Sequence, residues 1–322
     1  MNVYHSLAEV PADFGPSSLT IGNFDGVHLG HRRILKRVTA LAAEHGWKSS
    51  VLTFHPHPTH LVAPERAPRL LTTPEQRAEL MGEEGIQQVL ILPFTTELSR
   101  LTPEEFGGEL LVSRLGARAV VVGDNFRFGR GQAGNVHSLQ EFGRQFGFLT
   151  EVISAAKCRG RMTSSSAIRQ AIEKGRVALA ARMLRRPYAL EGEVVKGQGV
   201  GTKRTVPTLN LSTTAEVIPA SGVYLTRTYD SDTARKWNSI TNVGYRPTFG
   251  AANERTIETF VLDPLEGESP KHIRVAFLCR VRDERKFDTP ESLKAQILSD
   301  VRVARNYFRR LQSWSGGRLT TA

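Results

Sequence analysis

The sequence has little cysteine and no long apolar run. Its 322 residues include only two cysteines, Cys158 and Cys279, which argues against a secreted disulfide framework and against a cysteine-based zinc site. No stretch approaches the roughly 18 consecutive apolar residues that a membrane-spanning helix needs. The first residues lack the basic start and apolar run of a signal peptide. We therefore expect a cytoplasmic protein with no membrane partner.

The charge of the chain is strongly basic but not concentrated. Lysine and arginine number 43 against 32 acidic residues, a net charge of +11. Such a balance suits either nucleic acid or small polyphosphate substrates. The basic residues are spread along the chain with no run of five or more. We therefore expect no nucleic-acid partner and favour small anionic substrates.

The first half alternates short apolar runs with stretches of helical spacing. Helices are expected at about 31–44 and 103–115, from the recurrence of apolar residues and a proline suited to a first turn. Apolar strands separated by helices indicate an α/β fold with a parallel sheet covered on both faces. The expected strands are residues 19–21, 50–54, 88–92, 119–122 and 149–153.

The pattern changes near residue 185. Residues 165–184 are expected to be helical, and beyond them short strands alternate with turn residues, which favours a small antiparallel barrel. These strands include residues 189–195, 222–228, 237–243, 256–262 and 273–281. A final helix from about Pro290 carries an apolar stripe of Leu293, Ile297, Val301, Ala304 and Phe308 that we expect to face the core. We therefore predict two domains, residues 1–184 and 185–322.

The most informative segment lies between the first expected strand and the first expected helix. It reads Gly22-Asn23-Phe24-Asp25-Gly26-Val27-His28-Leu29-Gly30-His31. Open α/β sheets bind ligands at the carboxyl ends of their strands, and helix N-termini favour phosphate. His28 and His31 can donate hydrogen bonds to charge that develops on a phosphate. A zinc site or a plain surface pair is the alternative, although no third metal ligand stands out nearby.

This segment resembles the H-x-G-H motif of the nucleotidyltransferase superfamily. Its longer form is similar to that of the prokaryotic bifunctional FAD synthetases, the riboflavin kinase/FMN adenylyltransferases. Residues 53–58, 123–135 and 161–169 resemble further motifs of the same family. The resemblance implies that FMN attacks the α-phosphorus of ATP to give FAD and pyrophosphate. Positioning and charge stabilisation then supply the rate, and no protein nucleophile is needed.

The resemblance also implies roles for the matching residues. His28 and His31 stabilise the transition state. The expected ATP-binding residues of this site are Gly22, Phe24, Asp25, Gly26, His28, His31, Ser164, Ser165 and Arg169. The expected flavin contacts are His57, Pro58, Asn125 and Phe128. Two alternatives stay open: the serines can be a plain helix N-cap, and either Phe126 or Phe128 can be a core residue.

A second glycine-rich segment runs from Gly197 to Asn210. It lacks the Gly-Lys-Ser/Thr ending of a P-loop, and no helix is expected after it. The segment resembles the riboflavin kinase loop that ends in Pro-Thr-Ala-Asn, but has Leu209 for alanine and Thr205-Val206 where the family has Gly-Phe. The resemblance implies kinase ATP binding by Gly199, Gly201, Lys203, Thr208 and Asn210, and Mg²⁺ ligation by Thr208 and Asn210, whose oxygens suit that ion.

The third segment, residues 241–250, resembles the N-x-G-x-R-P-T-F signature of riboflavin kinases, and an acidic strand follows it. The resemblance implies that Glu258 is the base that accepts the proton of the riboflavin 5′-hydroxyl as it attacks the γ-phosphate of ATP. From the residues alone, Glu258 is more simply a solvated strand residue whose neighbours Ile257 and Thr259 face the other way.

Taken together, these resemblances imply a flavin-biosynthesis enzyme that phosphorylates riboflavin and adenylylates FMN. Its substrates are ATP, riboflavin and FMN, its cofactor is Mg²⁺, and at most a weak homo-oligomer is expected. One alternative keeps only the adenylyltransferase, because Thr205-Val206 departs from the kinase pattern. The other is a flavin-binding regulator that contacts RNA. Basic residues interleaved with aromatics would indicate that regulator, and no clear patch of this kind is present.

Overall fold

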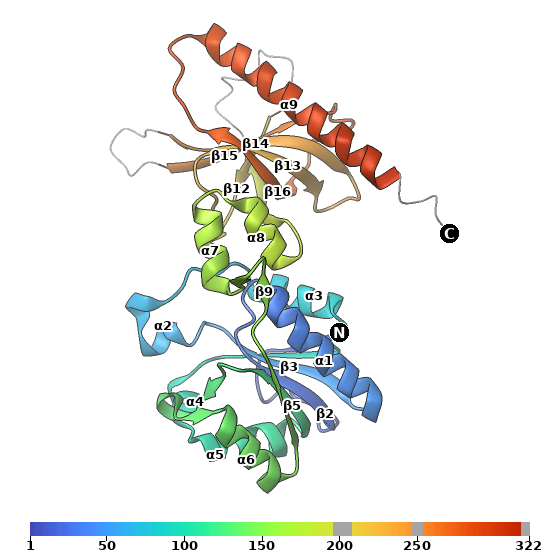
Figure 1. Ribbon diagram of the computed structural model, residues 1–322, viewed down its shortest axis with the longest axis vertical. Helices are drawn as coiled ribbons and strands as arrows, with labels where there is room; N and C mark the ends of the chain where they lie inside the picture. The colour runs from blue at the N-terminus through green and yellow to red at the C-terminus, as the bar shows by residue number, and fades with distance from the viewer. Residues whose placement is uncertain (196–207, 247–253, 317–322) are drawn as a thin grey trace. The chain divides into compact units, whose positions relative to one another are not determined.

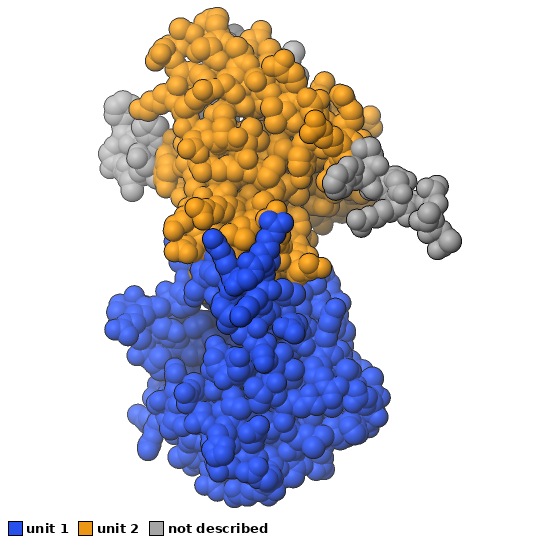
Figure 2. Space-filling view, viewed as in Figure 1, with its two compact units in different colours: residues 1–167 blue, residues 168–322 orange. Residues whose placement is uncertain are grey.

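The computed structural model describes residues 1–195, 208–246 and 254–316 (Figure 1). The chain divides into two compact units, residues 1–167 and 168–322, which Figure 2 shows in different colours. The predicted domain boundary after residue 184 stays a prediction. The two divisions differ only over residues 168–184, which form most of two helices.

The first unit is built on a six-stranded sheet whose pairings are all parallel, in the order β1-β4-β3-β2-β5-β8. The α/β prediction for this half is therefore confirmed. The sequence analysis did not predict β1, a three-residue strand that is added to the sheet beside β4. The strands are β1 (Asn2–Tyr4), β2 (Ser17–Ile21), β3 (Lys48–Phe54), β4 (Gln88–Leu92), β5 (Ala117–Gly123) and β8 (Leu149–Ile153).

Helices cover both faces of this sheet. On one face, α1 (Leu29–His45) and α3 (Pro74–Glu83) pack in a core with alternate residues of the strands. On the other face, a π-helix (Phe106–Arg114) and α6 (Val136–Phe146) pack on the remaining strand residues. Two buried layers explain why the strands read as continuous apolar runs. Shorter elements are α2 (Thr59–Val62), η1 (Pro64–Arg66), α4 (Thr96–Arg100), β6 (Arg127–Phe128), η3 (Arg130–Gln132), β7 (Gly134–Asn135), β9 (Lys157–Cys158) and β10 (Arg161–Met162).

The segment predicted as one helix at 103–115 has two parts. Its first turn is α5 (Pro103–Glu105), which Thr102 and Glu105 cap reciprocally. The π-helix η2 follows it. A β-carbon at Gly108 would lie 3.2 Å from the Phe146 ring, and one at Gly107 would lie 3.6 Å from Phe142. Glycine at these positions lets α6 pack closely against the wide helix.

The second unit is a closed six-stranded barrel in the order β11-β12-β15-β14-β13-β16 with antiparallel pairings. The predicted barrel is therefore confirmed. Helix α8 (Val177–Leu184) contacts β11 and β16. Helix α7 (Ser165–Glu173) begins before the division at residue 167. The strands are β11 (Tyr188–Val195), β12 (Thr208–Ser212), β13 (Gly222–Asp230), β14 (Lys236–Arg246), β15 (Glu254–Val261) and β16 (His272–Asp283).

The final helix, α9 (Pro290–Gly316), is confirmed, but only part of its predicted stripe is buried. Ala304 and Phe308 are buried in a core with Val223, Leu225 and Ile240 of the barrel. In contrast, Leu293 and Ile297 are each 39% exposed, so the expectation of a stripe that faces the core along its whole length is wrong. At this end, polar contacts hold the helix, because Asp300 accepts hydrogen bonds from Arg282 and Gln296.

Candidate functional site

The histidine motif forms the loop between β2 and the first turn of α1, at the carboxyl end of the parallel sheet. Its backbone is strained: Phe24 has a φ of 49° and Val27 a φ of 38°. Positive φ in a β-branched residue costs on the order of 1–3 kcal/mol and persists only where the surroundings enforce it. Val27 is fully buried. The surrounding contacts therefore hold the loop in a single, unfavourable shape.

The two histidines of the motif stack on each other, with ring centroids 3.6 Å apart and planes 14° from parallel. His28 is the N-cap of α1, and its Nδ1 accepts a hydrogen bond from the His31 N–H over 3.3 Å. An accepting Nδ1 places the proton of a neutral imidazole on Nε2. A β-carbon at Gly30 would lie 3.1 Å from the His28 ring. Glycine at this position leaves room for that ring across the first turn.

Burial lowers the pKa of His31 well below the ordinary value, and the neighbouring His28 and the Arg77 guanidinium lower it further. His31 Nδ1 is buried and has no hydrogen-bond partner among the described residues. Phe24 contacts the ring edge-on, with centroids 5.0 Å apart. His31 is therefore neutral at pH 7.

Asp25 was predicted to bind ATP, and its carboxylate holds a neighbouring loop. Asp25 is 2% exposed. Its Oδ1 accepts hydrogen bonds from the Leu71 N–H, the Thr72 N–H and the Thr72 hydroxyl, over 2.9 to 3.2 Å. The Gly26 N–H donates to the same Thr72 hydroxyl over 3.0 Å. These bonds fix the strained loop to residues 71 and 72, and a direct role for Asp25 in ATP binding stays a prediction.

The predicted serine motif also contacts this loop. The Ser165 hydroxyl donates to the Asp25 carbonyl over 2.9 Å. Ser164 precedes the first residue of α7, and its hydroxyl accepts from the Ala167 N–H over 3.2 Å, which is the geometry of an N-cap. Arg169 lies one turn after Ser165 on the same helix, beyond the division between the units. The N-cap interpretation therefore accounts for Ser164, and phosphate binding by these three residues stays a prediction.

The predicted flavin contacts lie on two loops of the first unit. His57 and Pro58 follow β3, and the Asn23 side-chain amide lies 2.9 Å from His57 Nε2. Asn125 is exposed after β5. Phe128 is only 5% exposed and packs between the rings of Phe106 and Phe126. Of the two phenylalanines considered, Phe128 is therefore the core residue, and flavin contact at all four predicted positions stays a prediction.

In the second unit, the predicted catalytic glutamate stands in a row of polar residues across the barrel wall. The register places Glu258 of β15 opposite Asn210 of β12 on one side and Asn242 of β14 on the other. The adjacent Ile257 and Thr259 are buried. Paired residues of an antiparallel sheet share a face, and so do residues two apart. Thr208, Asn210, Glu258 and Asn242 therefore share the outer face.

Part of the predicted kinase site lies outside the described residues. Gly199, Gly201 and Lys203 fall in residues 196–207, and the Pro247-Thr248-Phe249 part of the signature falls in residues 247–253. Thr208, which begins β12, is exposed, and Asn210 and Glu258 are half-buried. The hydroxyl of Thr208 and the amide oxygen of Asn210 are hard oxygen donors of the kind that Mg²⁺ prefers. The described part of this donor set fits that ion.

Arg77 of α3 contacts the motif loop of the first site, although the sequence pattern did not single it out. It is a buried arginine, 2% exposed, whose Nη1 donates to the Asn23 carbonyl over 2.7 Å and to the Thr53 hydroxyl over 3.1 Å. The available signal was its place in the helical stripe with Ala78 and Met81, both of which are buried. A charged residue in a buried stripe needs a partner, but the pattern does not say which.

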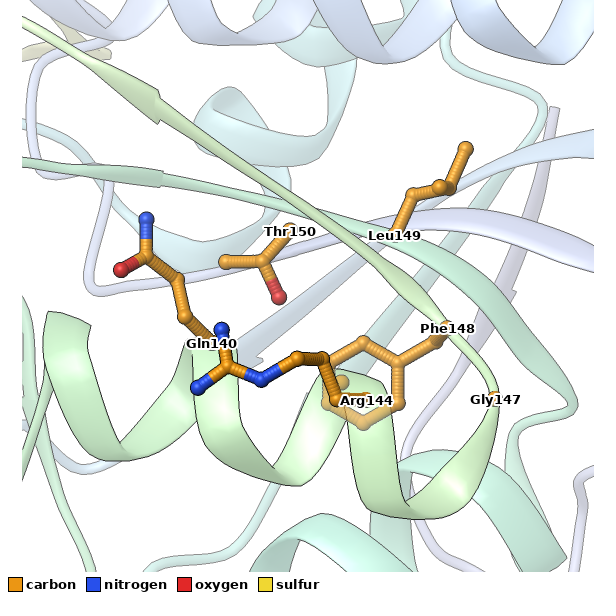
Figure 3. A pocket seen from close by; sticks show the side chains of 7 residues that line it. Gln140, Arg144, Gly147, Phe148, Leu149 and Thr150 are labelled. Atoms are coloured by element: carbon orange, nitrogen blue, oxygen red, sulfur yellow. The ribbon is translucent and has the colours of Figure 1, made fainter.

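A surface pocket lies away from these residues. It has a volume of about 570 Å³, and Figure 3 shows its side chains. It is lined by the end of α6 and the start of β8, through Gln140, Gly143, Arg144, Gly147, Phe148, Leu149 and Thr150. The motif loop follows the carboxyl end of β2, whereas this pocket lies at the amino end of the parallel strand β8. None of the predicted site residues lines it.

Comparisons with known proteins agree over nearly the whole chain. The family model for FAD synthetase matches residues 11–167, and the model for riboflavin kinase matches residues 184–308. A bifunctional riboflavin kinase/FMN adenylyltransferase of Pseudomonas fluorescens is 36% identical, over 89% of this chain and 91% of its own length. The Escherichia coli K12 protein of the same name is 34% identical, over 94% and 96%.

A solved structure also matches. The crystal structure of a macrolide-efflux protein from Streptococcus pneumoniae has a TM-score of 0.85 and 26% identity, and the match covers 94% of this chain and 98% of that one. Among the described residues of the present chain, no helix has the length and apolar character that a membrane crossing requires. The two matching family models and the two relatives place the chain plainly: it belongs to the bifunctional riboflavin kinase/FMN adenylyltransferase family.

Proposed function

We propose that this chain makes FAD from riboflavin in two ATP-dependent steps at two separate sites. The observation that carries the proposal is the presence of both family signatures in one chain, in the order FAD synthetase and then riboflavin kinase. Enzymes of both families use ATP. We further propose the domain division at residues 184 and 185, at the start of the riboflavin kinase match.

At the first site, the FMN phosphate attacks the α-phosphorus of ATP and pyrophosphate leaves. His28 presents its Nε2–H to the charge that develops on the phosphoryl oxygens, and this role is supported by the acceptor role of its Nδ1. His31, held as a neutral imidazole, donates a hydrogen bond to the same developing charge. Ser164, Ser165 and Arg169 bind the β- and γ-phosphates. Asn125, Phe128, His57 and Pro58 contact the flavin.

At the second site, the riboflavin 5′-hydroxyl attacks the γ-phosphate of ATP. Glu258 accepts the hydroxyl proton as the oxygen–phosphorus bond forms, and ADP leaves with the electrons of the broken bond. The polar row with Asn210 supports this role. Thr208 and Asn210 hold Mg²⁺, which neutralises phosphate charge when it is bound. Gly199, Gly201 and Lys203 bind the remaining phosphates.

The direct test is a chromatographic time course of the purified chain with riboflavin, ATP and Mg²⁺. We expect FMN to appear first and then to convert to FAD. Supplied FMN should give FAD without riboflavin. If supplied FMN gave FAD while riboflavin stayed unchanged, the kinase half of the proposal would be wrong, and Thr205-Val206 would be the first residues to restore to the family pattern.

A further inference from the structure

Arg77 is a buried cation that has no role in either of the proposed reactions. Its side chain comes from α3, an element that contributes none of the predicted site residues. Burial of a charged side chain is costly unless hydrogen bonds and charge compensate it. Arg77 is 2% exposed, and its Nε has no hydrogen-bond partner in the described part of the chain. The hydrogen bonds that its guanidinium group does form must therefore offset the cost of its burial.

The hydrogen bonds of Arg77 join two loops that the proposed reaction must align. Its Nη1 donates to the carbonyl of Asn23, in the histidine motif, over 2.7 Å. The same nitrogen donates to the Thr53 hydroxyl and the Phe54 carbonyl, at the end of β3, over 3.1 and 3.4 Å. The Thr53 hydroxyl itself donates to the Asn23 carbonyl over 3.3 Å. One guanidinium nitrogen thus links the end of β2 to the end of β3.

Each of the two linked strands leads to a different substrate in the proposed reaction. The loop after β2 carries His28 and His31, and the loop after β3 carries His57 and Pro58, the proposed flavin contacts. The Asn23 side chain reaches across to His57. A shift of Arg77 would therefore change the distance between the phosphate side and the flavin side of the site. It would also release a loop whose φ angles at Phe24 and Val27 are strained.

From this geometry we infer that Arg77 is a positioning residue of the adenylyltransferase site, which sets the histidine motif against the flavin loop. The inference rests on the proposed function of the first unit. Arg77 touches backbone and side-chain groups of the protein and is not assigned to a substrate.

The charged groups that act on His31 favour its neutral form. His28 on its own loop and Arg77 from α3 both lower the pKa of His31, in addition to burial. Burial lowers the pKa of Arg77 itself, and the charges of Asp25 and Glu75 partly offset this by favouring the guanidinium cation. Burial, the largest cause, remains when Arg77 is replaced by a neutral residue, so the pKa of His31 rises only part of the way toward its ordinary value. His31 then becomes protonated at a higher pH, so the acid limb of the adenylyltransferase profile moves to higher pH.

The experiment compares Arg77→Met, Arg77→Lys and the matched control Arg37→Met. Arg37 lies on α1 and forms an ion pair with Glu151 of β8, away from the motif. We expect Arg77→Met to lower kcat for FAD formation from FMN by about 10- to 100-fold, since misplacement of order 1 Å can cost that much. FMN formation from riboflavin by the same protein should stay within twofold. The Arg37 control should resemble the wild type in both reactions.

The pH profile separates positioning from simple loss of structure. Protonation of the FMN phosphate contributes equally to wild type and variants, so a difference between their acid limbs belongs to the protein. Arg77→Lys keeps the charge and should restore the wild-type acid limb, but with one donor group it should recover only part of kcat. If Arg77→Met matched the Arg37 control in FAD formation, or lowered it with no change in the acid limb, the inference would be overturned.

Two further measurements keep the inference testable apart from the proposed function. If the wild type made no FAD, the proposed function would fail first, and NMR titration of the His31 ring in wild type and Arg77→Met would still decide whether Arg77 acts on the histidine motif. An unchanged midpoint would overturn the inference. If Arg77→Met did not fold, Arg77→Lys would serve instead. A near-wild-type melting temperature with reduced kcat and unchanged KM would support positioning, and unchanged kcat would refute it.

Discussion

In the first unit, the proposed catalytic histidines stand on a strained loop that buried side chains fix from several directions. In the second unit, Glu258 stands on a regular strand, and the ladder of β12, β15 and β14 fixes its place. The loop needs Asp25, Thr72, Arg77 and Ser165 to keep its shape. In the barrel wall, the register of the paired strands is enough to place Glu258. A site on a loop therefore depends on distant residues that a site on a strand does not require.

The interiors behind the two sites differ as well. Behind the histidine loop lies an apolar core, and α3, one of the helices of that core, also carries the buried Arg77. Inside the barrel, by contrast, hydroxyls bond to each other from Thr228 through Ser239, Thr226 and Thr241 to Thr259, with every contact between 2.8 and 2.9 Å. All five residues are fully buried. This polar interior is satisfied without any charge, because each hydroxyl can both donate and accept.

The largest expected effect lies on the strand. Glu258→Gln removes the proposed base while keeping the size and polarity of the side chain. FMN formation should fall by roughly 10²- to 10⁴-fold, the usual range for a general base. FAD formation from supplied FMN should stay unchanged. Chromatography of the two half-reactions checks this, and Glu193→Gln, which changes an exposed carboxylate on β11 of the same barrel, is the matched control. Equal loss of both half-reactions in a folded variant would remove the distinction between the sites.

The complementary change lies on the loop. His28→Ala removes the ring that stacks on His31 and accepts its N–H. FAD formation should fall by about 10²- to 10³-fold, the range for the loss of one donor to a developing charge. FMN formation from riboflavin should persist. Retention of FAD formation within a factor of three would show that His28 is a capping residue and not part of the chemistry.

A smaller effect concerns stability. Asp25→Ala should lower the unfolding free energy of the first unit by about 2–3 kcal/mol, because it leaves three buried donors without their charged acceptor. The second unit should keep its stability. Calorimetry checks this if the two units unfold in separate transitions. Thr241→Val, which breaks the hydroxyl chain of the barrel, is the reciprocal control. A loss below about 0.5 kcal/mol for Asp25→Ala would contradict the role of this carboxylate as a lock.

The smallest effect is the titration of His31. The pKa of His31 in the folded chain is depressed, so the ring stays neutral as the pH falls through the ordinary value near 6.5. In the unfolded chain the same ring takes up a proton there. His31 therefore contributes stability that is present above about pH 6.5 and is lost as the pH falls toward its folded pKa. NMR of the ring should show no titration between pH 7.5 and about 6.5. A midpoint in that window would contradict the burial argument.

Most of the architecture could be predicted from the sequence, because the helical spacing of apolar residues and the patterns of the strands are both clear. Continuous apolar strands marked the parallel sheet, and alternating strands with turn residues marked the barrel. The sequence could not reveal β1, whose three residues become a strand only by pairing with β4. The exposure of Leu293 and Ile297 could not be predicted either, since an apolar stripe does not say how far along a helix its partner surface extends.

The site was predicted unevenly, for a physical reason. Motif residues that lie close together in the sequence, such as His28 and His31, can be recognised from their spacing. Residues that hold the motif from elsewhere do not: Thr72 and Arg77 lie about fifty residues away and reach the loop only through tertiary packing. The sequence also left open which of Phe126 and Phe128 lies in the core, because an alternating aromatic pair does not show which ring faces inward, and the structure buries Phe128.

The most direct test of two separate sites is to mix two variants, each with one site inactivated. Glu258→Gln and His28→Ala should each fail to make FAD from riboflavin with ATP and Mg²⁺. Two separate sites with released FMN predict that an equimolar mixture restores FAD, after a lag in which FMN accumulates. A mixture that makes no FAD, from variants that each retain their remaining half-reaction, would contradict the account of two independent sites that exchange FMN through solution.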